Sequence, residues 1–228
     1  MFYYDPAYFI YMLPAFILMM IAQGYVSSAY RKWSRVRVRS NFTGAEAAQR
    51  LMQFGNLYGV QIQATTGKLS DHYDPRKKTL RLSQGVYAGN SVAALAIAAH
   101  ELGHAVQDKE GYFPLRFRTM LVPAVNIGSY LGWIFIILGL LLGSTTLAWL
   151  GVIIFGGGAV FALATLPVEF NASARAKVML RHSGLIQTAE EERGVNAVLN
   201  AAALTYVAAL VTAALQLLYY ASLVTRRR

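Results

Sequence analysis

The chain has 228 residues, a net charge of +10, 56% hydrophobic residues and a mean hydropathy of +0.39. It contains no cysteine, which excludes disulfides and thiolate ligands, so any metal site must use histidine, carboxylate or water. This apolar composition indicates a membrane protein, and because the positive charges flank apolar segments, we expect lipid headgroups rather than nucleic acid as their partner.

The first apolar stretch, residues 8–30, is long enough to span a bilayer, and its proline and glutamine are tolerated in membrane helices. Five positive charges follow within residues 31–39, and such a cluster marks the cytoplasmic side of a membrane segment. The sequence therefore predicts a transmembrane anchor over residues 1–30, with its N-terminus outside the cell, and a cytoplasmic domain over residues 31–118.

This cytoplasmic domain has the pattern of a small α+β unit. Thr43 begins a capping-box pattern that opens an amphipathic helix to about residue 55. Alternating apolar residues predict short strands at 60–63 and 79–83. The run Asp-His-Tyr-Asp-Pro at 71–75 is typical of a turn.

The H-E-x-x-H run at residues 100–104 lies in a helix predicted over residues 91–108. On an α-helix, His100 and His104 share one face and can direct two imidazoles at one metal ion. Glu101 projects beside the metal rather than onto it, and it can act as general base toward a metal-bound water. The pattern predicts a zinc-peptidase site in a zincin-like domain built on this helix.

The strand before the motif helix has two interpretations. In zinc proteases an extended substrate commonly pairs with an edge strand above the site. The candidate for that strand is the run Leu80, Arg81, Leu82 and Ser83. An ordinary strand that packs on the helix fits the sequence equally well.

Two further apolar stretches, residues 121–142 and 147–166, are separated only by a short Gly-Ser-Thr break. They predict a membrane hairpin over residues 119–166 with both ends on the cytoplasmic side. A cytoplasmic helix over residues 167–199 and a C-terminal transmembrane helix with a basic tail over residues 200–228 are expected after it. This arrangement puts the three C-terminal arginines outside the cell, whereas positive charges flanking membrane segments normally stay in the cytoplasm. A fourth segment that re-enters the membrane without crossing it would resolve this conflict.

A catalytic zinc needs a third protein ligand besides the two histidines. The residue six positions after His104 is Glu110, which excludes the type of site with three histidines. The other type takes a glutamate from a later helix, and Glu169 fits because it begins a polar helix next to a membrane segment. Its alternative role is that of a glutamate favoured by the helix dipole. Four weaker candidates for the third ligand are His182, Asp71, His72 and Asp74.

Three sequence blocks carry a family resemblance over nearly the whole chain: AAHELGHAVQ, then LPVEFNASARA, then VLNAAALTYVAA. Together they resemble the YugP-type membrane zinc metallopeptidases. More distantly the chain is similar to HtpX-type proteases, whose third ligand is the glutamate of an E-x-x-x-D pattern; the matching positions here are Glu169 and Ser173. The resemblance implies an integral membrane peptidase with one zinc ion per chain, bound by His100, His104 and Glu169. It also implies that Glu101 is the catalytic base.

Residues that support the ligands or stabilise the transition state are predicted less directly. In related chemistry a histidine or tyrosine stabilises the oxyanion, and the candidates are Tyr206, His72 and His182. Asn171 and Ser173, which follow Glu169 closely in sequence, are the candidates for supporting contacts.

The sequence thus predicts a mostly α-helical integral membrane protein with about four transmembrane helices and a small α+β zincin-like cytoplasmic domain. The expected function is that of a zinc-dependent endopeptidase of the plasma membrane. It cleaves membrane or membrane-proximal proteins in protein quality control, with its active site on the cytoplasmic side. The alternative is a catalytically silent zinc protein that binds or chaperones partner proteins, although Glu101 would then have no use. A metal transporter ranks last because the spans lack charged residues and histidine.

The expected partners are a protein or peptide substrate and the lipid bilayer, and not nucleic acid. A membrane partner protein or a homo-oligomer is left open by the sequence.

Overall fold

The computed structural model describes residues 5–226. Within this range the chain forms two compact units, each assembled from separate stretches of sequence. We call them the apolar unit and the motif unit. The apolar unit comprises residues 5–23, 116–167 and 204–226, and the motif unit comprises residues 24–115 and 168–203.

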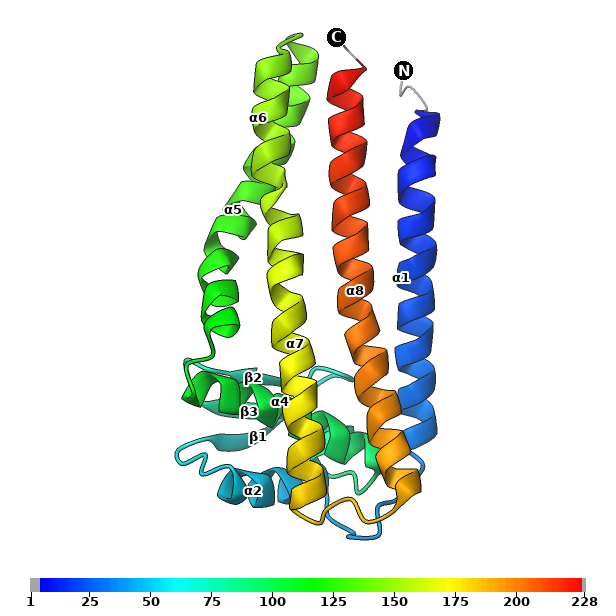
Figure 1. The fold of residues 1–228 in the computed structure, drawn as a ribbon, viewed down its shortest axis with the longest axis vertical. Helices are drawn as coiled ribbons and strands as arrows, with labels where there is room; N and C mark the ends of the chain where they lie inside the picture. Colours follow the sequence, from blue (N-terminus) through cyan, green and yellow to red (C-terminus); the bar gives the residue numbers. More distant parts are fainter. Residues whose placement is uncertain (1–4, 227–228) are drawn as a thin grey trace. The chain divides into compact units, whose positions relative to one another are not determined.

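Four segments of the described chain are long and apolar enough to cross a membrane (Figure 1). They are α1 (Pro6–Trp33), α5 (Phe113–Leu141), α6 (Thr145–Phe155) followed by α7 (Gly157–His182), and α8 (Ala189–Thr225). This confirms the predicted fold class, a mostly helical membrane protein with about four spanning helices and a small sheet.

Parts of two predicted segments lie outside the described residues. They are residues 1–4 of the N-terminal anchor and Arg227 and Arg228 of the basic tail.

Helices α5 and α6 form a tight hairpin around the Gly-Ser-Thr break. The Ser144 side chain accepts a hydrogen bond from the backbone N–H of Leu147 at 3.3 Å and so caps α6. A Cβ atom on Gly139 would lie 2.3 Å from the backbone nitrogen of Ala148. Glycine at such a contact lets two membrane helices approach backbone to backbone.

The two ends of the apolar unit meet. Arg226 Nη1 lies 3.7 Å from Asp5 Oδ1, and the Tyr219 hydroxyl donates to Asp5 Oδ2 at 3.4 Å. The end of α8 therefore lies beside the start of α1.

The motif unit is built around a three-stranded sheet and the motif helix. Its elements are α2 (Gly44–Phe54), β1 (Gln61–Thr65), β2 (His72–Asp74), β3 (Thr79–Ser83), α3 (Gln84–Tyr87) and α4 (Val92–Lys109), with the parts of α1, α7 and α8 that fall in its range. The strand order is β1-β3-β2, with β1 parallel and β2 antiparallel to β3. Helix α4 contacts α2, α3 and strands β2 and β3 (Figure 1).

The capping residues predicted at the starts of two helices are confirmed. Thr43 and Glu46 form the reciprocal capping box that opens α2. Ser91 caps α4 by accepting the backbone N–H of Ala94. Burial of apolar side chains from α4 and the sheet, with Leu80, Leu82 and Leu95 fully covered, then holds these elements together.

The turn predicted at residues 71–75 is wrong, because His72–Asp74 forms strand β2. Three residues are too few for an alternating pattern to be visible in the sequence, and the flanking Asp and Pro are typical of turns. The strand forms through non-local contacts: Tyr73 is paired with Leu80 of β3, and its hydroxyl donates to Asp108 of α4 at 3.0 Å.

The assignment of Leu80, Arg81, Leu82 and Ser83 as a substrate-binding edge strand is also wrong. These residues form β3, the central strand, which is paired with β1 on one side and β2 on the other. Its backbone hydrogen-bonding groups already serve the sheet, so an extended peptide has no free edge there.

Candidate metal centre

Helix α4 sets the spacing of the two motif histidines. The alanine-rich first half of this helix has high helix propensity and is almost entirely buried. His100 and His104 follow one turn apart, and their ring centroids lie 4.9 Å from each other. Only 9% of His100 is exposed to solvent.

Helix α7 supplies a carboxylate that faces both histidines. Glu169 is 3% exposed, and its Oε2 lies 3.2 Å from His100 Nε2 and 3.5 Å from His104 Nε2. One ligand atom from each of these three residues lies within 4.8 Å of the other two. In the described part of the chain this is the one group of three His, Asp or Glu side chains placed to share a metal ion.

The electrostatics of the group favour a cation. Burial alone would lower the pKa of His104, but its hydrogen bond to Glu169 and the charges of Glu101 and Glu169 outweigh burial and raise that pKa. Two carboxylates thus stabilise positive charge where the two Nε2 atoms converge. A divalent metal ion would serve the same electrostatic purpose.

Helices α4 and α7 can bring these side chains together because they approach closely at Gly103. This residue lies between the two histidines in sequence, against the backbone of Ala172. The glycine of the motif is therefore part of the packing between the helices that supply the three candidate ligands.

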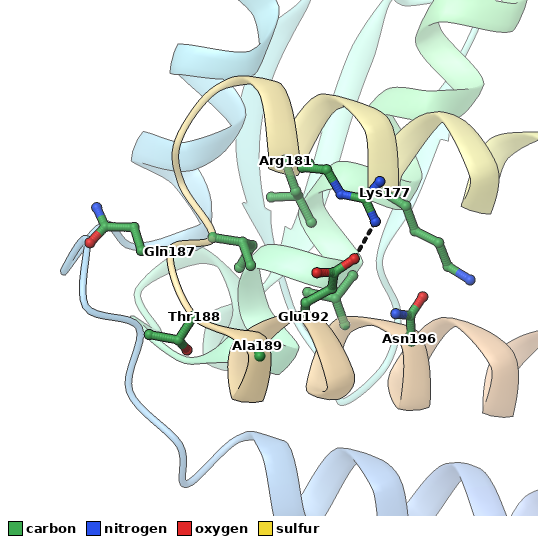
Figure 2. Close-up of a pocket in the computed structure, with 10 residues that line it drawn as sticks. Lys177, Arg181, Gln187, Thr188, Ala189, Glu192 and Asn196 are labelled. Carbon is green, nitrogen blue, oxygen red and sulfur yellow. Dashed lines mark hydrogen bonds and ion pairs between the residues drawn. The ribbon is translucent and has the colours of Figure 1, made fainter.

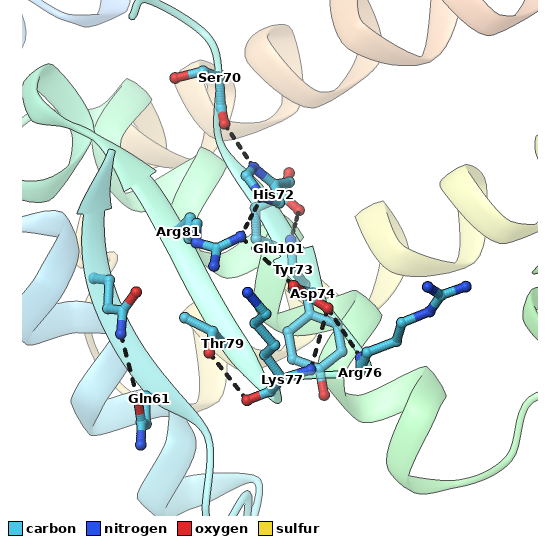
Figure 3. A network of polar contacts seen from close by, with 11 residues as sticks. Gln61, Ser70, His72, Tyr73, Asp74, Arg76, Lys77, Thr79, Arg81 and Glu101 are labelled. Carbon is cyan, nitrogen blue, oxygen red and sulfur yellow. Dashed lines mark hydrogen bonds and ion pairs between the residues drawn. The ribbon is translucent and has the colours of Figure 1, made fainter. Parts of the chain in front are cut away.

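Glu101 is held beside the metal group by the edge strand β2. Its Oε2 accepts the backbone N–H of Tyr73 at 3.1 Å (Figure 3). Glu101 is partly exposed, whereas Glu169 is buried. A fixed carboxylate with access to solvent is suited to accepting a proton rather than to binding metal.

Each histidine has a polar partner at its other ring nitrogen. His100 Nδ1 lies 3.1 Å from the Ser173 hydroxyl, and His104 Nδ1 lies 3.0 Å from Gln107 Oε1. Asn171 belongs to the same hydrogen-bond network, because its Oδ1 accepts a hydrogen bond from Gln107 Nε2 at 2.9 Å. The structure thus brings the candidates Ser173 and Asn171 to the site, and it adds Gln107.

Sequence reasoning missed Gln107, although a signal was present. The residue lies three positions after His104, which places both side chains on the same face of the helix. It also follows directly after the apolar residues Ala105 and Val106 in the motif helix.

Two of the weaker candidates for the third ligand, His72 and Asp74, are not brought to the metal group. His72 is exposed; its ring contacts the Ser70 carbonyl and Arg81 (Figure 3). It alternates with Tyr73, which faces helix α4, so His72 lies on the other face of the sheet. Asp74 shares that face and lies 3.6 Å from Arg81.

His182 is too far from the group to act in it. It lies thirteen residues after Glu169 on helix α7, about 20 Å along the helix axis, and its ring packs edge-on against Phe54. Tyr206 belongs to the apolar unit, and its role in stabilising an oxyanion stays a prediction.

Asp71 has a structural role in the sheet. Its Oδ1 accepts the Ser83 backbone N–H at 2.7 Å and the Ser83 hydroxyl at 3.0 Å. Burial raises the pKa of Asp71, the hydrogen bonds from Ser83 oppose this, and the charge of Glu101 adds to the increase. These contacts satisfy the carboxylate without a metal.

A separate pocket lies between the end of α7 and the start of α8. It has a volume of about 200 Å³, and the Arg181–Glu192 ion pair crosses it (Figure 2). Lys177, Gln187 and Asn196 also line it, but none of the candidate metal ligands does. Its contacts point to no particular ligand.

The residues of the metal group fit zinc. A catalytic zinc is held by three protein ligands drawn from histidine and carboxylate, and two histidines with one glutamate are an established set. Supporting hydrogen bonds at the outer nitrogens of the histidines are a regular part of such sites. The absence of cysteine from the chain agrees with a catalytic rather than a closed structural site.

Comparison with known proteins identifies the family of the chain. The chain is 46% identical over 199 residues to the "Putative membrane protease YugP" of Bacillus subtilis (strain 168). The aligned region covers 87% of this chain and 88% of that protein. No solved structure matches the chain. Residues 8–225 match the family described as "Putative neutral zinc metallopeptidase". The chain therefore belongs to that family of zinc metallopeptidases.

Proposed function

We propose that the protein is a membrane-embedded zinc endopeptidase whose single zinc ion is held by His100, His104 and Glu169. The observation that carries this proposal is the convergence of these three ligand atoms within 4.8 Å, with Glu101 fixed beside them. Family membership supports the same chemistry. A protein that used its metal only for structure would have no need of the partly exposed Glu101.

Each residue of the site then has a defined task. A zinc ion held there would lower the pKa of a water molecule and would polarise the scissile carbonyl. Glu101 accepts the proton of the attacking water and delivers it to the leaving amine. The Tyr73 N–H keeps the Glu101 carboxylate in place between these two transfers. His100, His104 and Glu169 bind the metal.

We infer that this site faces the cytoplasm of the plasma membrane and acts on membrane or membrane-proximal proteins. The five positive charges at residues 31–39 support this orientation, because they lie in the last turn of helix α1 and directly after it, and belong to the motif unit. The attachment of the site to four spanning helices supports substrates that lie in or near the bilayer.

The test is the zinc content per chain, together with cleavage of labelled casein and of a model membrane protein. We expect one zinc per wild-type chain and a clear loss of zinc in Glu169→Ala. The control Glu190→Ala, which changes an exposed glutamate of α8, should retain zinc.

In Glu101→Gln we expect zinc to be retained while cleavage falls by about 10²- to 10⁴-fold, the usual contribution of a general base. Full activity of Glu101→Gln would overturn the mechanism. Full zinc content in Glu169→Ala would show that the third ligand is elsewhere.

A further inference from the structure

Gln107 is a fully buried polar side chain, and all its described contacts involve the metal group or helix α7. Its Oε1 lies 3.0 Å from His104 Nδ1. Its Nε2 lies 2.8 Å from the Val168 carbonyl oxygen and 2.9 Å from Asn171 Oδ1. A buried amide satisfied at both ends is costly to disturb, because removing one partner leaves the other group unpaired.

The orientation of this amide is fixed by groups that can act only as a donor or only as an acceptor of a hydrogen bond. Arg175 can only donate, and its Nε lies 2.7 Å from Asn171, so Asn171 must present its oxygen there. The same oxygen contacts Gln107, which must therefore present its NH₂ group. The Val168 carbonyl, which can only accept, requires the same orientation of Gln107.

It follows that the Gln107 oxygen faces His104. An amide oxygen has no hydrogen to give, so the hydrogen of this bond must be on His104 Nδ1. A neutral imidazole carries only one N–H, which leaves the lone pair on Nε2. Nε2 faces the Glu169 carboxylate at 3.5 Å, which without metal favours a hydrogen on this nitrogen as well. A metal ion bound between the two groups would take the place of that hydrogen.

We propose that Gln107 is a positioning residue that selects the Nδ1–H tautomer of His104 and so presents Nε2 to the metal. The proposal rests on the proposed zinc site and adds the residue that keeps a hydrogen on Nδ1 of one ligand, which leaves Nε2 as the nitrogen available to the metal. The same amide also binds the carbonyl of Val168, the residue immediately before Glu169. One side chain thus orients one ligand and fixes the backbone next to another.

Arg175, which sets the orientation of Asn171, is itself held by two further contacts. Arg175 forms an ion pair with Glu110 at 2.7 Å, and its guanidinium carbon lies 5.9 Å from the centroid of the Tyr112 ring. His100 has no partner at Nδ1 that can act only as an acceptor. Its partner Ser173 is a hydroxyl, which can donate or accept and therefore does not by itself select a tautomer.

The first test reads the tautomer directly. The chain has only four histidines, so ¹⁵N-histidine labelling gives a spectrum in which each ring can be assigned by substitution. The metal-free Glu169→Ala variant lacks the carboxylate that competes for a hydrogen at Nε2. In alkaline buffer, where imidazoles are neutral, His104 of this variant should be protonated at Nδ1. Adding Gln107→Leu should remove this preference, and adding Gln107→Glu, which keeps an acceptor, should retain it. The signals of His72 and His182 serve as internal controls.

The second test is zinc affinity, measured by competition with a chelator of known affinity. Loss of a supporting partner of a metal-bound histidine typically weakens metal binding by about 10- to 100-fold, and we expect this of Gln107→Leu. Gln107→Glu should bind zinc more tightly than Gln107→Leu. Met179→Ala, a buried packing change on α7 in the same core, should lower thermal stability without moving the His104 signals.

The proposal is overturned if His104 keeps its Nδ1–H tautomer when Gln107→Leu is added to Glu169→Ala, or if Gln107→Leu alone binds zinc as the wild type does. A wild-type chain that binds no zinc would instead defeat the proposed function. The metal-free spectra would still decide the role of Gln107, so the two failures can be told apart.

Discussion

Gly103 of helix α4 lies directly against Ala172 of helix α7: a Cβ atom at Gly103 would be 2.5 Å from the Ala172 carbonyl oxygen. No rotamer change can relieve such a contact, because the atom in the way belongs to the backbone. The separation of the two helices that carry His100, His104 and Glu169 is therefore set by the absence of one methyl group.

We predict that Gly103→Ala separates these helices and weakens zinc binding by at least tenfold. Overpacking of this kind typically costs about 1–3 kcal/mol, which exceeds the gain of roughly 1 kcal/mol in helix propensity. Zinc affinity and the thermal unfolding midpoint should both fall. Gly24→Ala is the matched control, since a Cβ at that helical glycine would have no atom within 4 Å. Equal effects of the two substitutions would contradict the role of the Gly103 contact.

Ser173→Ala should weaken zinc binding by about 10- to 100-fold, because it removes the partner of His100 Nδ1. The control is Ser183→Ala, which removes another buried hydroxyl whose bond is to the Leu180 carbonyl. Chelator competition on both variants measures the effect. Unchanged affinity in Ser173→Ala would mean that His100 needs no support at Nδ1.

The ion pair of Glu110 with Arg175 predicts an acid-dependent loss of stability. The hydrogen bond from Arg175 lowers the pKa of Glu110 from its ordinary value of 4.5, against a smaller opposing effect of burial. A carboxyl group whose pKa is lower in the folded state stabilises the fold above its unfolded pKa. That contribution disappears as the pH falls through the lowered value.

Glu110→Gln should therefore unfold at a lower temperature than wild type at pH 6, and the difference should shrink as the pH falls below about 4.5. Thermal unfolding across this range checks the prediction. Glu190→Gln, an exposed glutamate, serves as the control. A difference that stays constant with pH would show that the substitution acts through packing rather than charge.

The proposed orientation can be tested in the native sequence background because the chain contains no cysteine. Lys68→Cys lies in an exposed loop of the motif unit, and Leu142→Cys lies at the tip of the α5–α6 hairpin. In intact cells a membrane-impermeant maleimide should label position 142 and not position 68. The reverse pattern would place the metal group outside the cell.

The features that sequence reasoning predicted best depend on neighbours in the chain. The spacing of His100 and His104 is a property of one helix, and the caps at Thr43 and Ser91 are bonds across three residues. The four spanning helices follow from length and composition alone. Glu169 was predicted on chemical grounds, since two histidines require a third ligand; it lies beside both of them, and its role as a ligand stays a prediction.

The features it missed depend on contacts between distant segments. Strand β2 exists because Tyr73 meets β3 and helix α4, and its own three residues resemble a turn. The central position of β3 is a property of the sheet order, which alternation within a strand does not encode. The contacts of Gln107 with Val168 and Asn171 join residues more than sixty positions apart.

That separation also bears on how the protein is made. His104 and Glu169 are 65 residues apart in sequence, and the hairpin of α5 and α6 is synthesised between them. At translation rates of about 5–20 residues per second, the nascent chain carries both histidines for several seconds before its third candidate ligand exists. The metal group therefore cannot be completed until the hairpin has been made, and a chain still being synthesised at that stage lacks one of its three candidate ligands.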